Sequence, residues 1–145
     1  MLKGVPAVIS PELLKILMEM GHGDELCIGD GNFPGAAIAK STVSGELLRA
    51  DGHTATEMLE AILKLFPLDT YAPPLYIMKK VDGDTVETPI WDEFAEIVKP
   101  YTSASLEQLE RFEFYERAKK SYAVLMTGET ALYANIIIKK GVVVE

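Results

Sequence analysis

Short apolar runs alternate with amphipathic helical segments along this chain, and this alternation constrains its fold more than any other feature. The apolar runs are bounded by turn residues, as buried strands are. Other segments repeat apolar residues at i, i+3 and i+4, the spacing of one buried helix face. Predicted strands cover residues 26–28, 47–50, 75–81, 122–126 and 135–138, with 142–144 as a further candidate. Strands that alternate with helices predict an α/β domain with helices on both faces of one sheet.

Capping signals mark where the helices begin. Thr54 and Glu57 form a capping box, in which each side chain accepts a free backbone N–H at the helix start. Ser105 and Gln108 repeat this pattern. Two more helices begin where a serine or threonine precedes a proline at the first helical position. The predicted helices cover residues 11–20, 55–66, 89–98 and 105–120.

Length and charge narrow the classes of function. A chain of 145 residues is predicted to form one domain over residues 1–145. Its 14 basic against 22 acidic residues give a net charge of −8, which repels phosphate backbones and anionic headgroups. We therefore expect no nucleic-acid partner and no membrane partner.

The apolar runs and the cysteine content indicate in which cellular compartment the protein is expected. The apolar runs fall short of the ~20 residues that span a bilayer, and the start of the chain lacks the pattern of an export signal. The single cysteine, Cys27, lies in an apolar run and is expected to pack in the core. A cytoplasmic protein is the simplest expectation.

The motifs of common cofactor and metal chemistry do not occur in this sequence. It has no glycine-rich phosphate loop and no Cys/His cluster for a metal, which leaves acid–base chemistry with two histidines. His22 lies between Gly21 and Gly23, where backbone can approach a ligand closely. From spacing alone, a capping or surface role is favoured over a catalytic one. His53 directly precedes a predicted helix cap, so a turn or capping role is expected there.

Three other polar positions have an ordinary structural interpretation beside a functional one. Asp30 follows a predicted strand, at the end where α/β sheets bind ligands, so its carboxylate would either accept ligand hydroxyls or close a turn. Arg111 lies among glutamates, as on a solvated helix face. The segment Tyr133-Ala134-Asn135 also fits an ordinary strand start.

Several longer motifs follow one another over nearly the whole chain. They lie at residues 9–15, 20–25, 33–34, 49–52, 71–75, 111–112, 114–118, 127–129, 133–135 and 139–142, together with Asp30. In this order they resemble the ribose pyranase/fucose mutarotase family, and most closely its fucose branch. A single such tetrapeptide would indicate little, whereas so many in sequence are specific.

The resemblance implies a fold, an activity and a set of site residues. The implied fold is a three-layer α/β/α domain with a mixed central sheet, as in ribose pyranase. The implied activity is a cofactor-free interconversion of the α and β anomers of L-fucose, and in this family also of the pyranose and furanose forms of D-ribose. The family's catalytic histidine falls on His22, and Tyr133 is a second candidate for proton transfer. The sugar-binding residues fall on Asp30, Arg111, Tyr133, Ala134 and Asn135.

Opening a sugar ring requires such residues for a physical reason. A hemiacetal opens when one proton reaches the ring oxygen and another leaves the anomeric hydroxyl, and it closes by the reverse steps on the other face of the aldehyde. An imidazole, with an ordinary pKa of about 6.5, can give or take such a proton at neutral pH. Asp30, Arg111 and Asn135 would hold hydroxyl groups so that the open sugar stays bound. No metal or organic cofactor is required.

Two positions depart from the pattern of the fucose branch. Ala134 stands where fucose-type members usually have glycine, and Asn32 stands where some members have histidine. The segments 22–25 and 114–118 favour fucose. D-Ribose pyranase therefore remains an alternative, as do a non-catalytic sugar-binding accessory protein and a purely structural oligomer-forming protein. The family further implies a homo-oligomer, a pentamer or a decamer, with sites near subunit interfaces.

Overall fold

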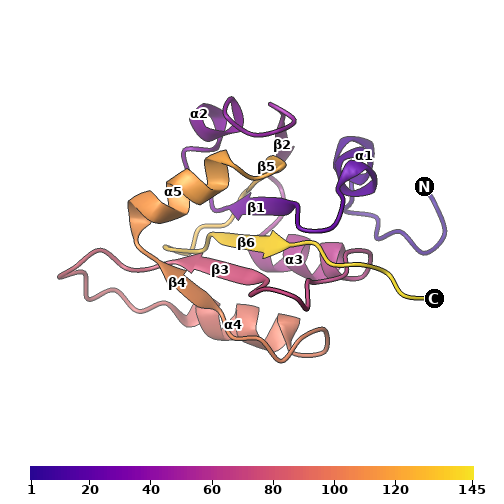
Figure 1. The fold of residues 1–145 in the computed structure, drawn as a ribbon. Helices are drawn as coiled ribbons and strands as arrows, with labels where there is room; N and C mark the ends of the chain where they lie inside the picture. Colours follow the sequence, from indigo (N-terminus) through magenta and orange to yellow (C-terminus); the bar gives the residue numbers. More distant parts are fainter.

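The computed structural model describes residues 1–145 and contains one mixed sheet of six strands. The strands are β1 (Glu25–Gly29), β2 (Leu47–Ala50), β3 (Leu75–Met78), β4 (Glu107–Leu109), β5 (Ala123–Thr127) and β6 (Ile136–Lys139). Their order across the sheet is β2-β5-β1-β6-β3-β4 (Figure 1). β6 pairs antiparallel with both of its neighbours, β1 and β3, whereas every other pairing is parallel. The predicted mixed sheet is therefore confirmed, with β6 as the one reversed strand.

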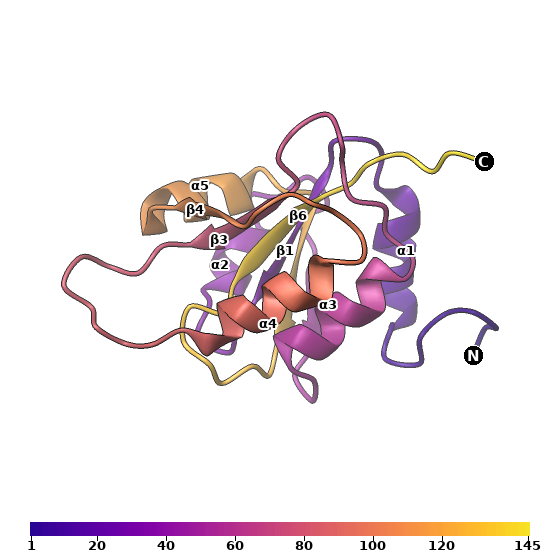
Figure 2. The ribbon, with the colours of Figure 1, turned by 90° about the horizontal axis from the view of Figure 1, so that it is seen from below.

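Helices cover both faces of this sheet. They are α1 (Pro11–Glu19), α2 (Gly35–Ala39), α3 (Ala55–Leu63), α4 (Pro89–Val98) and α5 (Arg111–Lys119). Figures 1 and 2 show α3 and α4 below the sheet, with α2 and α5 on its other face. None of the helices has the length and apolar character that crossing a membrane would require. The arrangement confirms the three layers expected from alternating strands and helices.

The strand residues alternate between two cores because successive side chains point to opposite faces. Leu26 and Ile28 of β1 belong to the larger core, of 26 buried residues, beside α1, α3 and α4. Cys27 between them lies in the smaller core, of 11 buried residues, beside α2 and α5. Cys27 is fully buried and burial raises the pKa of its thiol, so its predicted packing role is confirmed.

The capping signals place two helix starts correctly. The Ser10 hydroxyl accepts the Leu13 N–H at 3.1 Å at the start of α1. At the start of α3, Thr54 Oγ1 accepts the Glu57 N–H at 3.2 Å while Glu57 Oε2 accepts the Thr54 N–H at 3.0 Å. α3 ends at Leu63, three residues earlier than predicted, because the helix gives way to a turn at residues 64–65.

The second predicted capping box is wrong. No helix begins at Ser105, because residues 107–109 form β4, which supplies the parallel partner at the open edge of β3. α5 begins only at Arg111, where the Glu110 carboxylate accepts the N–H groups of Phe112 and Glu113 at 2.8 and 3.2 Å.

Three further features differ from the prediction. β3 ends at Met78 instead of residue 81, since the following residues leave the sheet as an exposed loop. Residues 142–144 are exposed and pair with no strand. α2 was not predicted, because its sequence of glycine, alanine and isoleucine carries neither a cap nor an apolar stripe.

The strand directions bring distant segments together at one end of the strands, where β1, β3 and β5 finish and β6 begins. Because β6 alone is reversed, the residues that precede it lie beside those that follow β1, β3 and β5. Glu129, buried in this region, accepts the Ala55 N–H at 3.1 Å and the Ala131 N–H at 3.0 Å through its two carboxylate oxygens. Its backbone carbonyl accepts the Gly31 N–H at 2.9 Å. Glu129 therefore fastens the segment between β5 and β6 to α3 and to the end of β1.

Replacing Glu129 by alanine tests this fastening. The substitution leaves the N–H groups of Ala55 and Ala131 without their acceptors, and each buried unpaired group costs about 1–3 kcal/mol. We expect Glu129→Ala to lower the free energy of unfolding by about 2 kcal/mol or more in urea. The control is Glu60→Ala, the same change at an exposed position of α3. Equal stability of the two variants would contradict the assigned role of Glu129.

Candidate functional site

A pocket of about 260 Å³ opens at the end of the sheet where β1 finishes and β6 begins. Four of the residues predicted from the sequence lie around it, and they come from three separate segments: Asp30, Arg111, Tyr133 and Asn135. Asp30 follows β1, Arg111 begins α5 after β4, and the other two precede β6. Strand direction therefore explains why residues so far apart in sequence line one pocket.

Asp30 closes a turn with its side chain and lies in the wall of the pocket. Its side chain is 3% exposed, with Oδ1 accepting the Asn32 N–H at 2.9 Å and Oδ2 accepting the Ala134 N–H at 3.2 Å. Its own N–H donates to Asn135 Oδ1 at 2.8 Å. Burial raises the pKa of Asp30 above its ordinary value, although these hydrogen bonds oppose the shift. The carboxylate thus closes a turn and also lines the pocket, where it can accept hydroxyl groups.

Ala134 takes part through its backbone. Its methyl group is fully buried in the larger core, and its N–H is the donor to Asp30. Ala134 is not among the residues that line the pocket. Its small side chain keeps the segment close to the sheet between Tyr133 and Asn135, which both face the pocket.

Tyr133 is held in an unusual backbone conformation. Its φ of 55° makes it the one residue other than glycine with positive φ, a region that is costly for a bulky side chain. The Trp91 indole N–H donates to its carbonyl at 2.9 Å. Its hydroxyl donates to Asp84 Oδ2 at 2.6 Å and accepts the Val81 N–H at 3.2 Å. These contacts fix the ring against the pocket.

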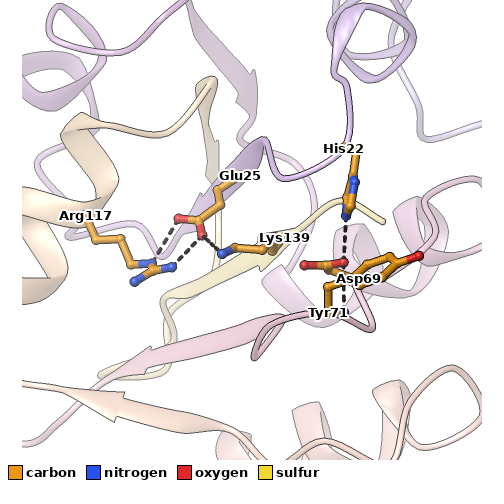
Figure 3. A network of polar contacts seen from close by, with 6 residues as sticks. All are labelled: His22, Glu25, Asp69, Tyr71, Arg117 and Lys139. Atoms are coloured by element: carbon orange, nitrogen blue, oxygen red, sulfur yellow. Dashed lines mark hydrogen bonds and ion pairs between the residues drawn. The ribbon is translucent and has the colours of Figure 1, made fainter. Parts of the chain in front are cut away.

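Arg111 supplies the positive charge of the pocket. Its guanidinium lies 4.7 Å from the centre of the Phe112 ring and forms none of the ion pairs within the chain. The rest of α5 is anchored by Arg117, which donates to both oxygens of Glu25 at 2.9 and 2.6 Å, with Lys139 3.5 Å away (Figure 3). Arg117 also stacks on Tyr76 at 3.7 Å. α5 is therefore fixed to the sheet while Arg111 stays available to a ligand.

His22 lies at the opposite end of the strands, where β1 begins. It precedes β1, whereas Asp30 follows it, and a strand of five residues at about 3.3 Å each separates the two by roughly 17 Å or more. His22 Nε2 is 3.0 Å from Asp69 Oδ1, and its ring centre lies 5.2 Å from that of Tyr71 (Figure 3). The histidine is 44% exposed. Within one chain, the structure does not bring His22 to the pocket.

Asp69 was missed by the sequence reasoning, because 47 residues separate it from His22. It is 4% exposed, and Oδ1 also accepts the Tyr71 N–H at 3.2 Å. Burial opposes its ionisation, but hydrogen bonds from His22, Tyr71 and Thr70 together hold its pKa below the ordinary value. When His22 Nε2 carries the proton it donates to Asp69, which leaves Nδ1 as the acceptor of an exposed imidazole.

Other candidate groups have structural positions. The His53 N–H donates to the Ala50 carbonyl at 3.0 Å, and its ring lies 3.4 Å from the Glu57 carboxylate, so it occupies the turn that was predicted. No three side chains of His, Cys, Asp or Glu gather where they could hold a metal ion. Asp84 and Trp91 were also missed, because 49 and 42 residues separate them from Tyr133, which they contact.

Comparisons with known proteins cover nearly the full chain. Residues 3–143 match the model of the RbsD / FucU transport protein family. A fucose mutarotase of Danio rerio is 52% identical over 147 aligned positions, covering 98% of this chain and 94% of the relative. The crystal structure of FucU from Bifidobacterium longum is 53% identical, with a TM-score of 0.93 over 98% of this chain and 100% of that one. Fucose mutarotase from Streptococcus pneumoniae, solved with L-fucose, is 46% identical. Its TM-score is 0.90, and the match covers 99% of this chain and 100% of that one.

Removing the His22 imidazole tests the pairing with Asp69. The folded pKa of Asp69 lies below its unfolded value of about 3.9, so its ionised form stabilises the fold above that value, and the stabilisation is lost as pH falls through the folded pKa. In His22→Ala burial remains and one donor is lost, so the folded pKa of Asp69 rises toward the unfolded value and less stability is lost on acidification.

Carboxyl ¹³C NMR titration and urea unfolding from about pH 6 to about pH 3 measure both effects. His53→Ala is the matched control, because its partner is Glu57. An unchanged Asp69 titration in His22→Ala would show that the pair does not form in solution.

Proposed function

Because this chain belongs to the RbsD / FucU transport protein family, we propose that it is an L-fucose mutarotase. It is an isomerase that interconverts the α and β anomers of L-fucose by opening and closing the sugar ring. Support comes from two relatives of this name, one of them solved with L-fucose, which are 52% and 46% identical to this chain. The ligand of the pocket is accordingly a monosaccharide.

The observation that carries this proposal is the mixture of groups around the pocket. Asp30 offers acceptors, Arg111 offers donors, and Asn135 offers an amide, which together suit the several hydroxyl groups of a sugar. L-Fucose also has a methyl group in place of one hydroxymethyl group. The lining also has apolar residues, which suit that methyl group and the apolar face of the ring. They include Phe33, Met78, Val81, Leu132 and Tyr115.

Ring opening needs an acid and a base on one sugar. A proton must reach the ring oxygen as the C1–O5 bond breaks, while the anomeric hydroxyl loses its proton and C1=O1 forms. Tyr133 faces the pocket and His22 does not, so the two predicted proton-transfer residues cannot act on one sugar within one chain. Rotation about C1–C2 of the open aldehyde, followed by the reverse steps, yields the other anomer.

A second copy of the chain supplies His22 in this proposal. The exposed imidazole is oriented by buried Asp69 and lies beside Tyr71, which is 79% exposed. The assembly is a homo-oligomer, a pentamer or a decamer of stacked pentamers, as the family resemblance implies. In this assembly, the end of the sheet that bears the pocket in one copy meets the end that bears His22 in another copy. His22 then exchanges protons with the sugar held by Asp30, Arg111 and Asn135.

Exchange spectroscopy on the anomeric protons of L-fucose tests the activity at equilibrium, where no net change occurs. The wild-type protein is expected to accelerate α/β exchange above the rate in buffer. His22→Ala should lose about 10²–10⁴-fold of this acceleration, the usual contribution of a positioned acid or base. L-Fucose should still raise the melting temperature of His22→Ala, because the pocket is intact. His53→Ala, at a turn outside the pocket, is the control with unchanged rate.

Other outcomes assign the other functions. Acceleration of D-ribose pyranose–furanose exchange alone would identify a ribose pyranase. A thermal shift with L-fucose and no acceleration of either sugar would identify a binding protein without turnover. If L-fucose causes no thermal shift and neither sugar exchanges faster than in buffer, the remaining alternative is a structural oligomer.

A further inference from the structure

The exposed loop over residues 79–88, between β3 and α4, reaches Tyr133. It projects beyond the rest of the molecule in Figure 2. Within it, Asp84 Oδ1 accepts the Val86 N–H at 3.0 Å, and Lys80 donates to the Val86 carbonyl at 3.0 Å. Val81 and Asp84 also line the pocket. The loop is therefore ordered by its own contacts where it meets the site.

The hydrogen bonds of the Tyr133 hydroxyl restrict what it can do for a sugar. A phenol has one proton to donate, and here that proton goes to Asp84 Oδ2 at 2.6 Å. This length is typical of a charge-assisted O–H···O⁻ bond. One lone pair of the oxygen accepts the Val81 N–H. Toward the pocket, the hydroxyl can then only accept a hydrogen bond.

We propose that Asp84 is a positioning residue of the isomerase, which acts through Tyr133 and makes its hydroxyl the acceptor of the anomeric proton. This inference rests on the proposed function and specifies the base of that reaction. Asp84 does not touch the reacting atoms. It determines the direction of the Tyr133 proton and receives it when the sugar opens.

The proton movements balance without any further reactant. The O1–H proton of the sugar moves to Tyr133 Oη as the phenol proton moves to Asp84 Oδ2. The electron pair of the O1–H bond forms C1=O1, the C1–O5 bond breaks, and O5 takes a proton from the His22 imidazolium of a second copy. Ring closure on the other face of the aldehyde returns both protons.

The charges around the pair keep its resting state suitable for this step. The hydrogen bond to Asp84 raises the pKa of Tyr133, and the same bond, with that from Val86, lowers the pKa of Asp84. Lys80 also favours ionised Asp84, whereas Arg111, which lines the same pocket, opposes the rise for Tyr133. At neutral pH the phenol is therefore protonated and Asp84 is ionised, which is the arrangement that accepts a proton.

Asp84→Asn tests the proposal, because an amide keeps an oxygen for the Tyr133 hydroxyl but cannot take its proton. Saturation curves from L-fucose exchange spectroscopy should show kcat lowered at least about tenfold, with KM changed less than about twofold. Asp82→Asn removes the same charge from the same exposed loop and should keep the wild-type values. In ¹³C NMR titrations of the tyrosine ring, the pKa of Tyr133 should be lower in Asp84→Asn than in wild type.

A double variant separates a role through Tyr133 from a role of the loop itself. In a Tyr133→Phe background, Asp84→Asn should lower kcat no further, since the residue through which Asp84 acts is already lost. A further tenfold loss there, or wild-type kcat in Asp84→Asn alone, would overturn the proposal while the mutarotase activity stands. A wild-type protein that does not accelerate L-fucose exchange would overturn the proposed function, and this inference with it.

Discussion

The buried carboxylate of Asp30 is the contact on which the pocket depends, because it joins the end of β1 to the start of β6. It accepts backbone N–H groups from Asn32 and Ala134, while its own N–H donates to Asn135. These bonds form only because β6 is reversed between β1 and β3, so that its first residues meet the carboxyl ends of its neighbours. A single buried charge thus fixes the turn, the pocket wall and the direction in which Asn135 approaches a ligand.

The same strand directions separate the two functional groups of residues. His22, with Asp69 and Tyr71, occupies the edge where β1 begins, and the pocket occupies the edge where β1 ends. A strand cannot be shortened without losing the ladder that holds the sheet together, so the separation is a property of the fold. The proposed reaction uses both groups, and it therefore includes a second copy of the chain.

Local sequence signals predicted most of the elements, because caps and apolar spacing are set by neighbouring residues, as at Ser10 and Thr54. They failed where pairing with distant strands decides the outcome: residues 107–109 form β4 along the edge of β3 that β6 leaves open, despite a capping pattern at Ser105. The pocket residues Asp30, Arg111 and Asn135 followed from the family resemblance. Partners remote in sequence, such as Asp69 for His22 and Asp84 for Tyr133, had no local signal and came only from the structure.

Mixed assemblies of two inactive variants test the shared site most directly. His22→Ala retains an intact pocket, and Arg111→Ala retains His22 while losing an exposed side chain that forms no ion pair. If each site combines the pocket of one copy with His22 of another, random one-to-one assembly restores both in about a quarter of the sites. L-Fucose exchange should then recover to about a quarter of the wild-type rate when the variants are assembled together. No recovery in verified mixed oligomers would contradict a site completed by the second copy.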